Sequence, residues 1–353
     1  MSLIDDVREY ETWLRERCAV DEAGLRKKHK RMVKDPFIFF RATCFRFART
    51  IDGLVSDLKR GPVVPSVGDA HIENWGTWRD GDGRLVWGVN DFDDAALLPY
   101  AYDLVRLATS ARLAPGLPGQ RRDRSAQILG GYAEGLARPA PIFADDTKPW
   151  LQGLVSRPAT KTDAFTLMLD GLDPADPPPP ARTALSRALP TGATLCRYAM
   201  RRVGGGALGR PRYLAIARWQ GGRIVRESKA IVPSAWDWAA GRAEEPHLLE
   251  RVAAGAYRAP DPFLHLGDGY IVRRLAPDSA KIDLAEDEAA EFGAELLANM
   301  GADLAAIHAS EGASGAIAAD LAQRPKGWLH EAAKAAGAAV EQDFEAWVAH
   351  RRP

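Results

Sequence analysis

Two short polar segments in the first third of the chain carry residue types that bind metals and move protons. They read GDAHIEN over residues 68–74 and NDFDD over residues 90–94, with a DGDG turn and an alternating strand pattern between them. Because a hairpin brings its two ends together, we expect Asp69, Asn74 and Asp91 to converge. Close carboxylates repel unless a cation neutralises them or one stays protonated. Oxygen ligands suit hard cations, so the pattern predicts an Mg²⁺ or Mn²⁺ site, with Asp93 as a candidate second carboxylate.

A glycine-rich segment further along has the composition of a phosphate-binding loop. Gly204, Gly205, Gly206 and Gly209 form a G-x-G-x-x-G pattern between two stretches with strand character. Glycines let backbone amides approach phosphates closely, although such runs are also common as simple turns. In a dinucleotide-binding fold the motif opens a helix, whereas a strand pattern follows it here. Lys229, on the next strand, completes an arrangement that favours phosphate binding.

The composition is that of a folded globular protein with no bias toward polyanions. The 353 residues include 47 Lys plus Arg and 47 Asp plus Glu, and the isoelectric point is near 7.1. This balance gives no global attraction to nucleic acid or to acidic membranes. Cys18, Cys44 and Cys196 have no disulfide or metal-binding spacing, and the sequence contains neither a signal peptide nor a membrane-spanning run. We expect a cytoplasmic protein whose partner is a small molecule.

The pattern of helix, strand and breaker residues divides the chain into four stretches. Residues 1–172 combine helical periodicity over 4–33 and 37–59 with the strands and loops that carry the acidic segments. The proline-rich run at 173–182 predicts a linker that is neither helix nor central strand, since proline lacks the amide donor and fixes φ. Residues 183–277 have strand patterns expected to form a small antiparallel lobe. Residues 278–353 read as helices that complete a larger lobe, so the predicted fold class is α+β.

Several segments together resemble a known bacterial family. KDPFIFFRATCFRFA, VGDAHIENWG, VNDFDDAALLPYAYDLVRLATS and RRVGGGALGRPRYLAI look like the family catalogued as domain of unknown function 2252, over about residues 30 to 310. That family is in turn similar to the protein-kinase-like phosphotransferases, notably the aminoglycoside and choline kinase branch. Members of that branch have a catalytic loop H-G-D-x-H-x-x-N and a metal-binding strand D-F-x-x-A. The resemblance implies a two-lobed kinase-like fold that binds ATP and Mg²⁺.

The resemblance also implies a role for each matching residue of the acidic segments. Asp69 matches the aspartate that accepts the proton of the substrate hydroxyl, and Asn74 and Asp91 match the metal ligands. Asp103 matches the aspartate that braces the catalytic loop. His71 is expected to stabilise this loop by hydrogen bonding rather than to bind metal.

On the other side of the expected cleft, the resemblance implies that the glycines cover the phosphates and that Lys229 contacts the α- and β-phosphates. Such a lysine has an acidic ion-pair partner, for which Glu250 is the first choice and Glu244 and Glu245 are rivals. Arg273 and Arg274 alternate faces on a predicted strand, so one of them is expected to point toward the cleft and the other outward.

The order of the motifs departs from the kinase pattern. Ordinary kinases begin with the glycine loop and the lysine and continue to the catalytic loop and metal strand, whereas here the last two come first. The resemblance therefore implies a circularly permuted fold, with the catalytic loop N-terminal to the glycine-rich lobe and the large lobe made from both ends of the chain. Val67 also stands where the kinase pattern has a histidine at the start of the loop.

The reaction implied is transfer of the γ-phosphoryl group of ATP to a hydroxyl of a small molecule. Two alternatives stay open. One is a non-catalytic nucleotide-binding regulator on the same fold. The other is a metallophosphoesterase, whose first motif the GDAH sequence resembles, although no G-N-H-type motif follows. Transfer of AMP is compatible with the same motifs, and no pattern identifies the acceptor or the oligomeric state.

Overall fold

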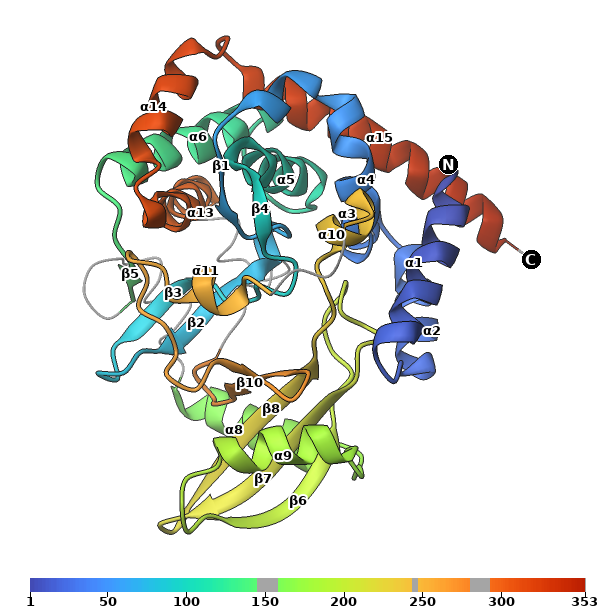
Figure 1. Cartoon of the computed structure of the whole chain (residues 1–353), viewed down its shortest axis with the longest axis vertical. Coiled ribbons are helices and arrows are strands. Elements are labelled where there is room, and N and C mark those ends of the chain that lie inside the picture. Colours follow the sequence, from blue (N-terminus) through green and yellow to red (C-terminus); the bar gives the residue numbers. More distant parts are fainter. Residues whose placement is uncertain (145–157, 243–246, 280–292, 353) are drawn as a thin grey trace.

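Helices and antiparallel sheets are distributed between a larger and a smaller lobe (Figure 1). The computed structural model describes residues 1–144, 158–242, 247–279 and 293–352. The predicted α+β class is confirmed, because the chain combines many helices with several sheets. Both chain ends belong to the larger lobe and lie on the same side of the molecule (Figure 1).

The larger lobe is mainly helical. Its helices are α1 (Leu3–Arg17), α2 (Glu22–Met32), α3 (Pro36–Ala42), α4 (Cys44–Leu54), α5 (Tyr100–Leu113), α6 (Arg121–Ala137), α10 (Ala235–Ala240), α11 (Leu249–Ala253), α13 (Gly293–His308), α14 (Ser314–Gln323) and α15 (Trp328–Arg351). Helices α6 and α13 pack so closely that a Cβ on Gly131 would lie 1.9 Å from the carbonyl oxygen of Ala298. This contact joins a helix from the first half of the chain to one near its end.

The helices expected from periodicity near the N-terminus are each divided in the structure. The pattern over 4–33 forms α1 and α2, and the pattern over 37–59 forms α3 and α4 followed by a short 3-10 helix. Asp21 precedes α2, and Thr43 separates α3 from α4. The Thr43 hydroxyl donates to the Phe39 carbonyl oxygen at 2.8 Å, and such side-chain bonds to the backbone favour helix ends. The aromatic side chains of this region are buried, as expected: Phe37, Phe39, Phe40, Phe45 and Phe47.

The main hydrophobic core of the larger lobe draws on both halves of the chain. It includes Ile51, Trp75 and Leu104 from the first third and Leu304 and Ala336 from the C-terminal helices. Burial of apolar surface is the dominant stabilising contribution in folding. The C-terminal helices are therefore part of the body that carries the acidic segments.

A hairpin in the larger lobe brings the two acidic segments together. It consists of β2 (Trp75–Arg79) and β3 (Leu85–Val89), and Trp75 pairs with Val89. The adjoining residues, Asn74 and Asn90, therefore lie at the same end, where the Asn90 amide donates to the Asn74 carbonyl oxygen at 3.2 Å. The remaining strands of this lobe are β1 (Val63–Ser66), its partner β4 (Ala96–Pro99), and β5 (Ile142–Phe143), which pairs with β3.

The smaller lobe is a five-stranded antiparallel sheet with a helix on each face. In spatial order its strands are β6 (Thr194–Met200), β7 (Arg212–Trp219), β8 (Gly222–Ala230), β10 (Tyr270–Arg274) and β9 (His265–Gly267). Helix α9 (Pro179–Ala188) packs Leu185 in one cluster with Tyr213, and α8 (Pro158–Asp170) packs Leu169 in another with Leu214. Because neighbouring strand residues point to opposite faces, α8 and α9 cover opposite sides of the sheet.

The proline-rich run is more ordered than the linker that its composition predicts. The Met200 amide donates to the Asp173 carbonyl oxygen at 3.0 Å, and the Ala175 amide donates to the Tyr198 carbonyl oxygen at 3.2 Å. Residues 179–182 are the first turn of α9, so the prediction that they could not be helical is wrong. Proline is tolerated in a first turn, where its missing N–H would have no partner within the helix.

Candidate active site

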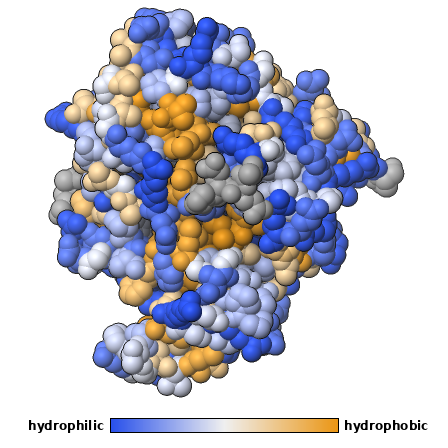
Figure 2. Space-filling model, in the orientation of Figure 1, coloured by the Kyte–Doolittle hydropathy of each residue, from blue (hydrophilic) through white to orange (hydrophobic). Residues whose placement is uncertain are grey.

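A cavity of about 320 Å³ is lined by residues of both lobes. Asp69, His71, Asn74, Asp91 and Asp93 come from the larger lobe, and Gly204, Gly205 and Gly206 come from the loop between β6 and β7. Apolar side chains complete the wall: Val89, Phe92, Leu264 and Leu275. Hydrophobic side chains also gather toward the middle of the face in Figure 2, above the smaller lobe. The structure thus brings the acidic segments and most of the glycine loop to one cavity.

Asp103 fixes the loop that carries Asp69. It is fully buried on α5, and its carboxylate accepts hydrogen bonds from the amides of Val67 and Gly68 at 2.7 and 2.9 Å. His308, at the end of α13, lies with Nε2 3.1 Å from the same carboxylate. Asp103 therefore holds the backbone of the loop and links it to a helix near the C-terminus.

Arg106, which is outside the set of residues predicted from the motifs, holds the carboxylate of Asp69. Its Nε and Nη2 atoms lie 2.7 and 2.5 Å from Oδ1 of Asp69. The guanidinium is fully buried and stacks 4.3 Å from the ring centroid of Phe40. Arg106 follows Asp103 by three residues on α5, and this spacing places the two side chains on one helix face. The spacing is the one feature of the sequence that could have indicated Arg106 as a site residue. His71 lies beside the pair, with Nε2 3.8 Å from Oδ2 of Asp69.

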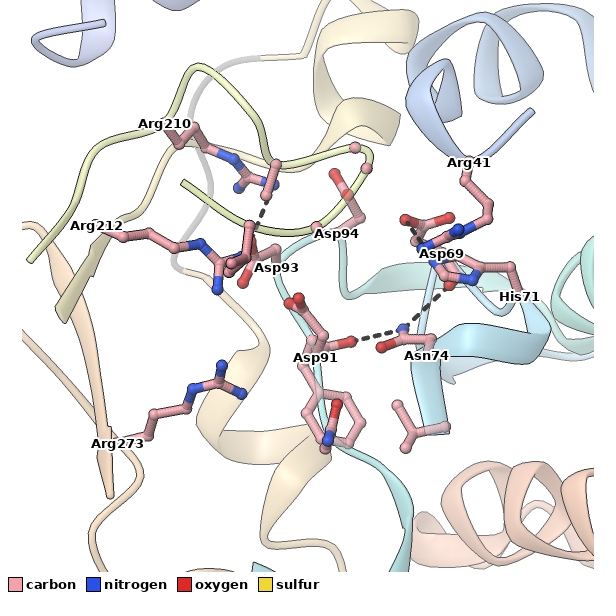
Figure 3. A pocket seen from close by; sticks show the side chains of 18 of the residues that line it. Arg41, Asp69, His71, Asn74, Asp91, Asp93, Asp94, Arg210, Arg212 and Arg273 are labelled. Atoms are coloured by element: carbon pink, nitrogen blue, oxygen red, sulfur yellow. Dashed lines mark hydrogen bonds and ion pairs between the residues drawn. The ribbon is translucent and has the colours of Figure 1, made fainter. Parts of the chain in front are cut away.

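The side chain of Asn74 connects the two acidic segments. Its Nδ2 donates to the carbonyl oxygens of Asp69 and Asp91 at 3.1 and 3.0 Å (Figure 3). The residue is 2% exposed, and Oδ1 is buried without a hydrogen-bond partner among the described residues. A buried polar atom without a partner is unfavourable, and an amide oxygen beside a carboxylate is a suitable ligand for a hard cation. Asn74 and Asp91 therefore fit Mg²⁺ or Mn²⁺.

Lys229 reaches the second acidic segment from the smaller lobe. Its Nζ lies 3.0 Å from Oδ1 of Asp91 and also forms an ion pair with Asp93, which Arg210 contacts at 2.9 Å. Burial, and then the Asp91 carboxylate, raise the pKa of Asp93. Burial lowers the pKa of Lys229, although the two carboxylates oppose this shift. Because two cations already contact Asp93, the structure favours Asn74 and Asp91 over Asp93 as metal ligands.

Glu250, the expected partner of Lys229, occupies a different place within the described part of the chain. It is exposed and accepts a hydrogen bond from the Leu266 amide at 2.7 Å. The physical reason is that α11 packs Leu249 and Val252 into the core of the larger lobe instead of lying beside β8. The rival candidates at 244 and 245, both glutamates, lie outside the described residues.

The first part of the glycine loop lies directly over the Asp69 loop. A Cβ on Gly206 would lie 2.7 Å from the Arg41 carbonyl oxygen and 4.0 Å from Oδ2 of Asp69. Helix α2 also contacts the loop, since Nη1 of Arg31 donates to the Gly204 carbonyl oxygen at 2.7 Å. Only glycine permits so close an approach of the two backbones.

Gly209 has a different role from the other glycines of the motif. It is not among the residues that line the cavity. Its φ is 104°, and its carbonyl oxygen accepts the Asp21 amide at 2.8 Å. A Cβ at this position would lie 2.4 Å from Cδ2 of Leu25 on α2. Gly209 is therefore required for packing against α2. The sequence motif could not show this, because it does not distinguish a glycine that packs from a glycine that contacts a ligand.

One trio of Cys, His, Asp or Glu side chains within the described ranges is close enough to hold a metal, and it differs from the predicted set. Cys44, Asp69 and Asp94 each place one ligand atom within 4.8 Å of the others. Burial raises the pKa of the Cys44 thiol well above its usual value, so the thiol keeps its proton. Asp94 accepts the Ala235 amide at 2.9 Å, and Asp69 is paired with Arg106. These contacts disfavour a cation between the three side chains.

Most of the arginines that give the cavity its charge have no recognisable signal in the sequence. Those that line it are Arg41, Arg201, Arg210, Arg212, Arg258, Arg273 and Arg274. Arg210, Arg212 and Arg273 lie on one side of the acidic residues and Arg41 lies on the other (Figure 3). Both Arg273 and Arg274 line the cavity, but their side chains have different partners: Arg273 pairs with Glu227, whereas Arg274 lies 3.4 Å from Asp261 and donates to the Arg79 carbonyl oxygen at 2.5 Å.

The chain belongs to a family of uncharacterized bacterial proteins. The model of this family, described as "Uncharacterized protein conserved in bacteria (DUF2252)", matches residues 20–141 and 181–350. The family membership that the motifs predicted is therefore confirmed. No curated protein matches the chain, and no solved structure does. In the part of the chain that the structure describes, no helix has both the length and the apolar character to cross a membrane.

Proposed function

We propose that this protein is an ATP- and Mg²⁺-dependent phosphotransferase that transfers the γ-phosphoryl group to a hydroxyl of a small molecule. The observation that carries the proposal is one cavity lined by Asp69, Asn74 and Asp91 on one side and by the glycine loop on the other. Phosphoryl transfer depends mainly on alignment of the reactants and neutralisation of charge. Carboxylates and backbone amides in one cavity, with Lys229 paired to Asp91 beside it, are suited to both.

Asp69 is the group that accepts the proton of the acceptor hydroxyl in this proposal. Arg106 occupies Oδ1, at 2.7 Å from Nε, and Oδ2 lies 4.0 Å from the Cβ position of Gly206. A hydroxyl placed against Oδ2 would therefore lie beneath the glycine loop. A general base within hydrogen-bond reach of the nucleophile can orient it and take up its proton.

The other groups of the cavity bind and orient the phosphates. Asn74 and Asp91 would hold the metal, since the Asn74 oxygen is buried without a partner among the described residues and lies beside a carboxylate segment. Mg²⁺, when bound, neutralises the charge that develops on the transferred group. Lys229, whose Nζ lies 3.0 Å from Asp91, exchanges this ion pair for phosphate oxygens. Backbone amides of the glycine loop add further donors.

A circularly permuted kinase-like fold is part of the same proposal. In the smaller lobe, β6, the glycine loop, β7 and the lysine-bearing β8 follow one another and lie side by side. In the larger lobe, helices from both chain ends share one core, and the two ends lie on the same side of the molecule (Figure 1). A permutation requires chain ends that are near each other at the surface, so this arrangement supports it.

The experiment that tests the proposal compares three variants in nucleotide binding and turnover. Mg²⁺ with ATP should raise the melting temperature of the wild type and leave that of Asp91→Ala unchanged, because a ligand stabilises only the state that binds it. Asp69→Asn should keep the shift in melting temperature and lower turnover of ATP with an acceptor by about 100-fold. Asp82→Asn is the matched control, because its side chain is 82% exposed in the β2–β3 turn.

Equal nucleotide affinity in the wild type and in Asp91→Ala would refute the assignment. Tight binding with no turnover across a panel of sugars, alcohols and amino alcohols would favour the non-catalytic regulator. Hydrolysis of phosphoesters without ATP would favour the metallophosphoesterase. Detection of AMP attached to the acceptor would replace phosphoryl transfer with AMP transfer on the same site.

A further inference from the structure

Glu227 on β8 is surrounded by three arginines of the smaller lobe. Its carboxylate lies 2.9 Å from Nη1 of Arg201, 3.3 Å from Nη1 of Arg212 and 2.6 Å from Nη2 of Arg273. Arg273 is the cross-strand partner of Glu227 on β10, Arg212 begins β7, and Arg201 follows β6 directly. We call Arg201, Arg212 and Arg273 the arginine triad.

The arginine triad carries more positive charge than Glu227 neutralises. Among the described residues, Glu227 is the one carboxylate within ion-pair distance of all three guanidinium groups. The carboxylate is 1% exposed, and the two other acids that act on Arg212 and Arg273, Asp91 and Asp93, are already paired with Lys229 and Arg210. Burial lowers the pKa of Arg212, and Arg273 adds to this shift, whereas Glu227, Asp91 and Asp93 oppose it. A buried surplus of like charge is unfavourable unless an anion compensates it.

The triad also has donors that are not used within the protein. Arg212 is 6% exposed, and its Nε is buried with no hydrogen-bond partner in the described ranges; Nε of Arg201 is in the same state. All three arginines line the candidate active site. The side chains of Arg201 and Arg273 remain 19% and 23% exposed, so a molecule in the cavity can reach them. A cluster that served only to stabilise the sheet would need neither the spare donors nor this access.

We propose that the arginine triad is a binding subsite for a phosphate group of the ligand, separate from the position held by Lys229 and the glycine loop. Glu227 and Lys229 are two residues apart on β8, so they lie on the same face of the sheet and about 7 Å apart. A chain of linked phosphates is long enough to contact both positions. Guanidinium groups match phosphate oxygens in pairs, which a lysine cannot do.

The chemical class of ligand that follows is one with a phosphate chain running along β8. The inference rests on the proposed function for the identity of this ligand, but the anion subsite itself stands on the charges and donors of the triad. A ligand that presents a neutral group to the triad would leave its surplus charge uncompensated.

The test is calorimetric titration of the full chain with inorganic tripolyphosphate in the absence of metal. Arg201→Gln and Arg273→Gln should each weaken binding about tenfold or more, because each removes a charge-assisted hydrogen bond. Arg201→Lys keeps the charge but loses the paired N–H donors of the guanidinium group, so its affinity for tripolyphosphate should fall between those of the wild type and Arg201→Gln. Arg218→Gln removes the same charge from an exposed position of β7 and should bind as the wild type does.

Weaker binding in the triad variants, with wild-type affinity in Arg218→Gln, would support the subsite. Equal affinity in all variants, or no binding of tripolyphosphate by the wild type, would overturn it. If a glutamine variant fails to fold, Arg201→Lys decides, because it retains the charge opposite Glu227. Triad-dependent binding of tripolyphosphate without binding of ATP and Mg²⁺ would remove the proposed function and keep the subsite. Turnover of ATP, with tripolyphosphate binding that does not depend on the triad, would keep the proposed function and remove the subsite.

Discussion

The two walls of the cavity are held in place by different interactions. On the larger lobe, Asp103 accepts hydrogen bonds from two backbone amides, and Asn74 donates to two backbone carbonyl oxygens. On the smaller lobe, Glu227 and Lys229 are held chiefly by ion pairs with other side chains, several of which are arginines. Backbone groups stay in place when a ligand enters, whereas an ion pair exchanges partners when a new charge arrives.

Because of this difference, the groups of the larger lobe are suited to alignment and those of the smaller lobe to anion binding. The larger lobe presents Asp69 and Asn74 on a loop that is already bound to the core, which suits groups that must be aligned with reacting atoms. The smaller lobe presents charges whose present partners are the carboxylates Glu227, Asp91 and Asp93, which suits groups that bind an anion. Variants in the two walls should therefore differ in what they change.

The largest effect is expected for Asp103→Ala on the larger lobe. The change leaves the amides of Val67 and Gly68, both buried, without an acceptor and also removes the partner of His308. The free energy of unfolding should fall by about 3 kcal/mol, because each buried donor without a partner is unfavourable. Urea denaturation followed by tryptophan fluorescence measures this change.

Asp103→Asn is the control for that prediction, since it keeps one acceptor oxygen and should lose less stability than the alanine variant. A loss below about 1 kcal/mol for Asp103→Ala would show that the loop does not depend on this carboxylate, and the contrast between the two walls would then disappear.

An intermediate effect is expected from acid on the smaller lobe. Burial disfavours the charged form of Glu227, but Arg273, Arg212 and Arg201 hold its pKa well below the ordinary 4.5. The unfolded chain therefore takes up a proton at this position before the folded chain does. The stabilisation from Glu227 is complete above 4.5 and is lost as the pH falls below that value toward the lowered pKa. Melting temperatures measured from neutral pH down to about pH 3 should show this decline.

The Glu227→Gln variant separates this group from other acids. It should be less stable than the wild type at neutral pH and should lose less additional stability on acidification. Parallel curves for the two proteins in the acid range would mean that Glu227 does not contribute to the decline. The arginines would then be held by other interactions.

The smallest effect is expected where the two walls meet, at the glycine loop. In Gly206→Ala the new Cβ would lie 2.7 Å from the backbone oxygen of Arg41, so the loop must move. Nucleotide or tripolyphosphate binding should weaken about tenfold, corresponding to about 1.4 kcal/mol. In Gly205→Ala the nearest atom is Nη2 of Arg41 at 3.7 Å, an ordinary contact, so this matched variant should weaken binding less. Equal effects in the two variants would contradict the close approach at Gly206.

Short-range patterns were the most reliable guide to the site. The acidic segments are separated by one hairpin, and the pairing of Trp75 with Val89 leaves Asn74 and Asn90 side by side. Strand pairing has few possible registers, so spacing alone was sufficient there. The same kind of reasoning failed for Gly209, because a motif gives the residue type and not the neighbour, and for Pro179, because proline ends a helix at most positions but not at its start.

The ion-pair partners of Lys229 and Glu227 could not be predicted from the sequence. Placing an acid beside Lys229 required the position of α11, and that helix is set by the burial of Leu249 and Val252 in the core of the larger lobe. The sequence does show that Glu227 and Lys229, two residues apart on one strand, share a face of the sheet. It does not show which distant arginines pair with Glu227.

The sequence by itself determined that Asp69, Asn74 and Asp91 would meet, because a loop, a hairpin and a regular register leave them one arrangement. Only the tertiary structure decided which cations oppose them. Arg106, which pairs with Asp69, and Lys229, which pairs with Asp91, come from two separate elements, and a long charged side chain can pair with any acid within its reach. Their partners therefore depend on how the two lobes pack, which is set by the whole hydrophobic core and not by any local stretch of the chain.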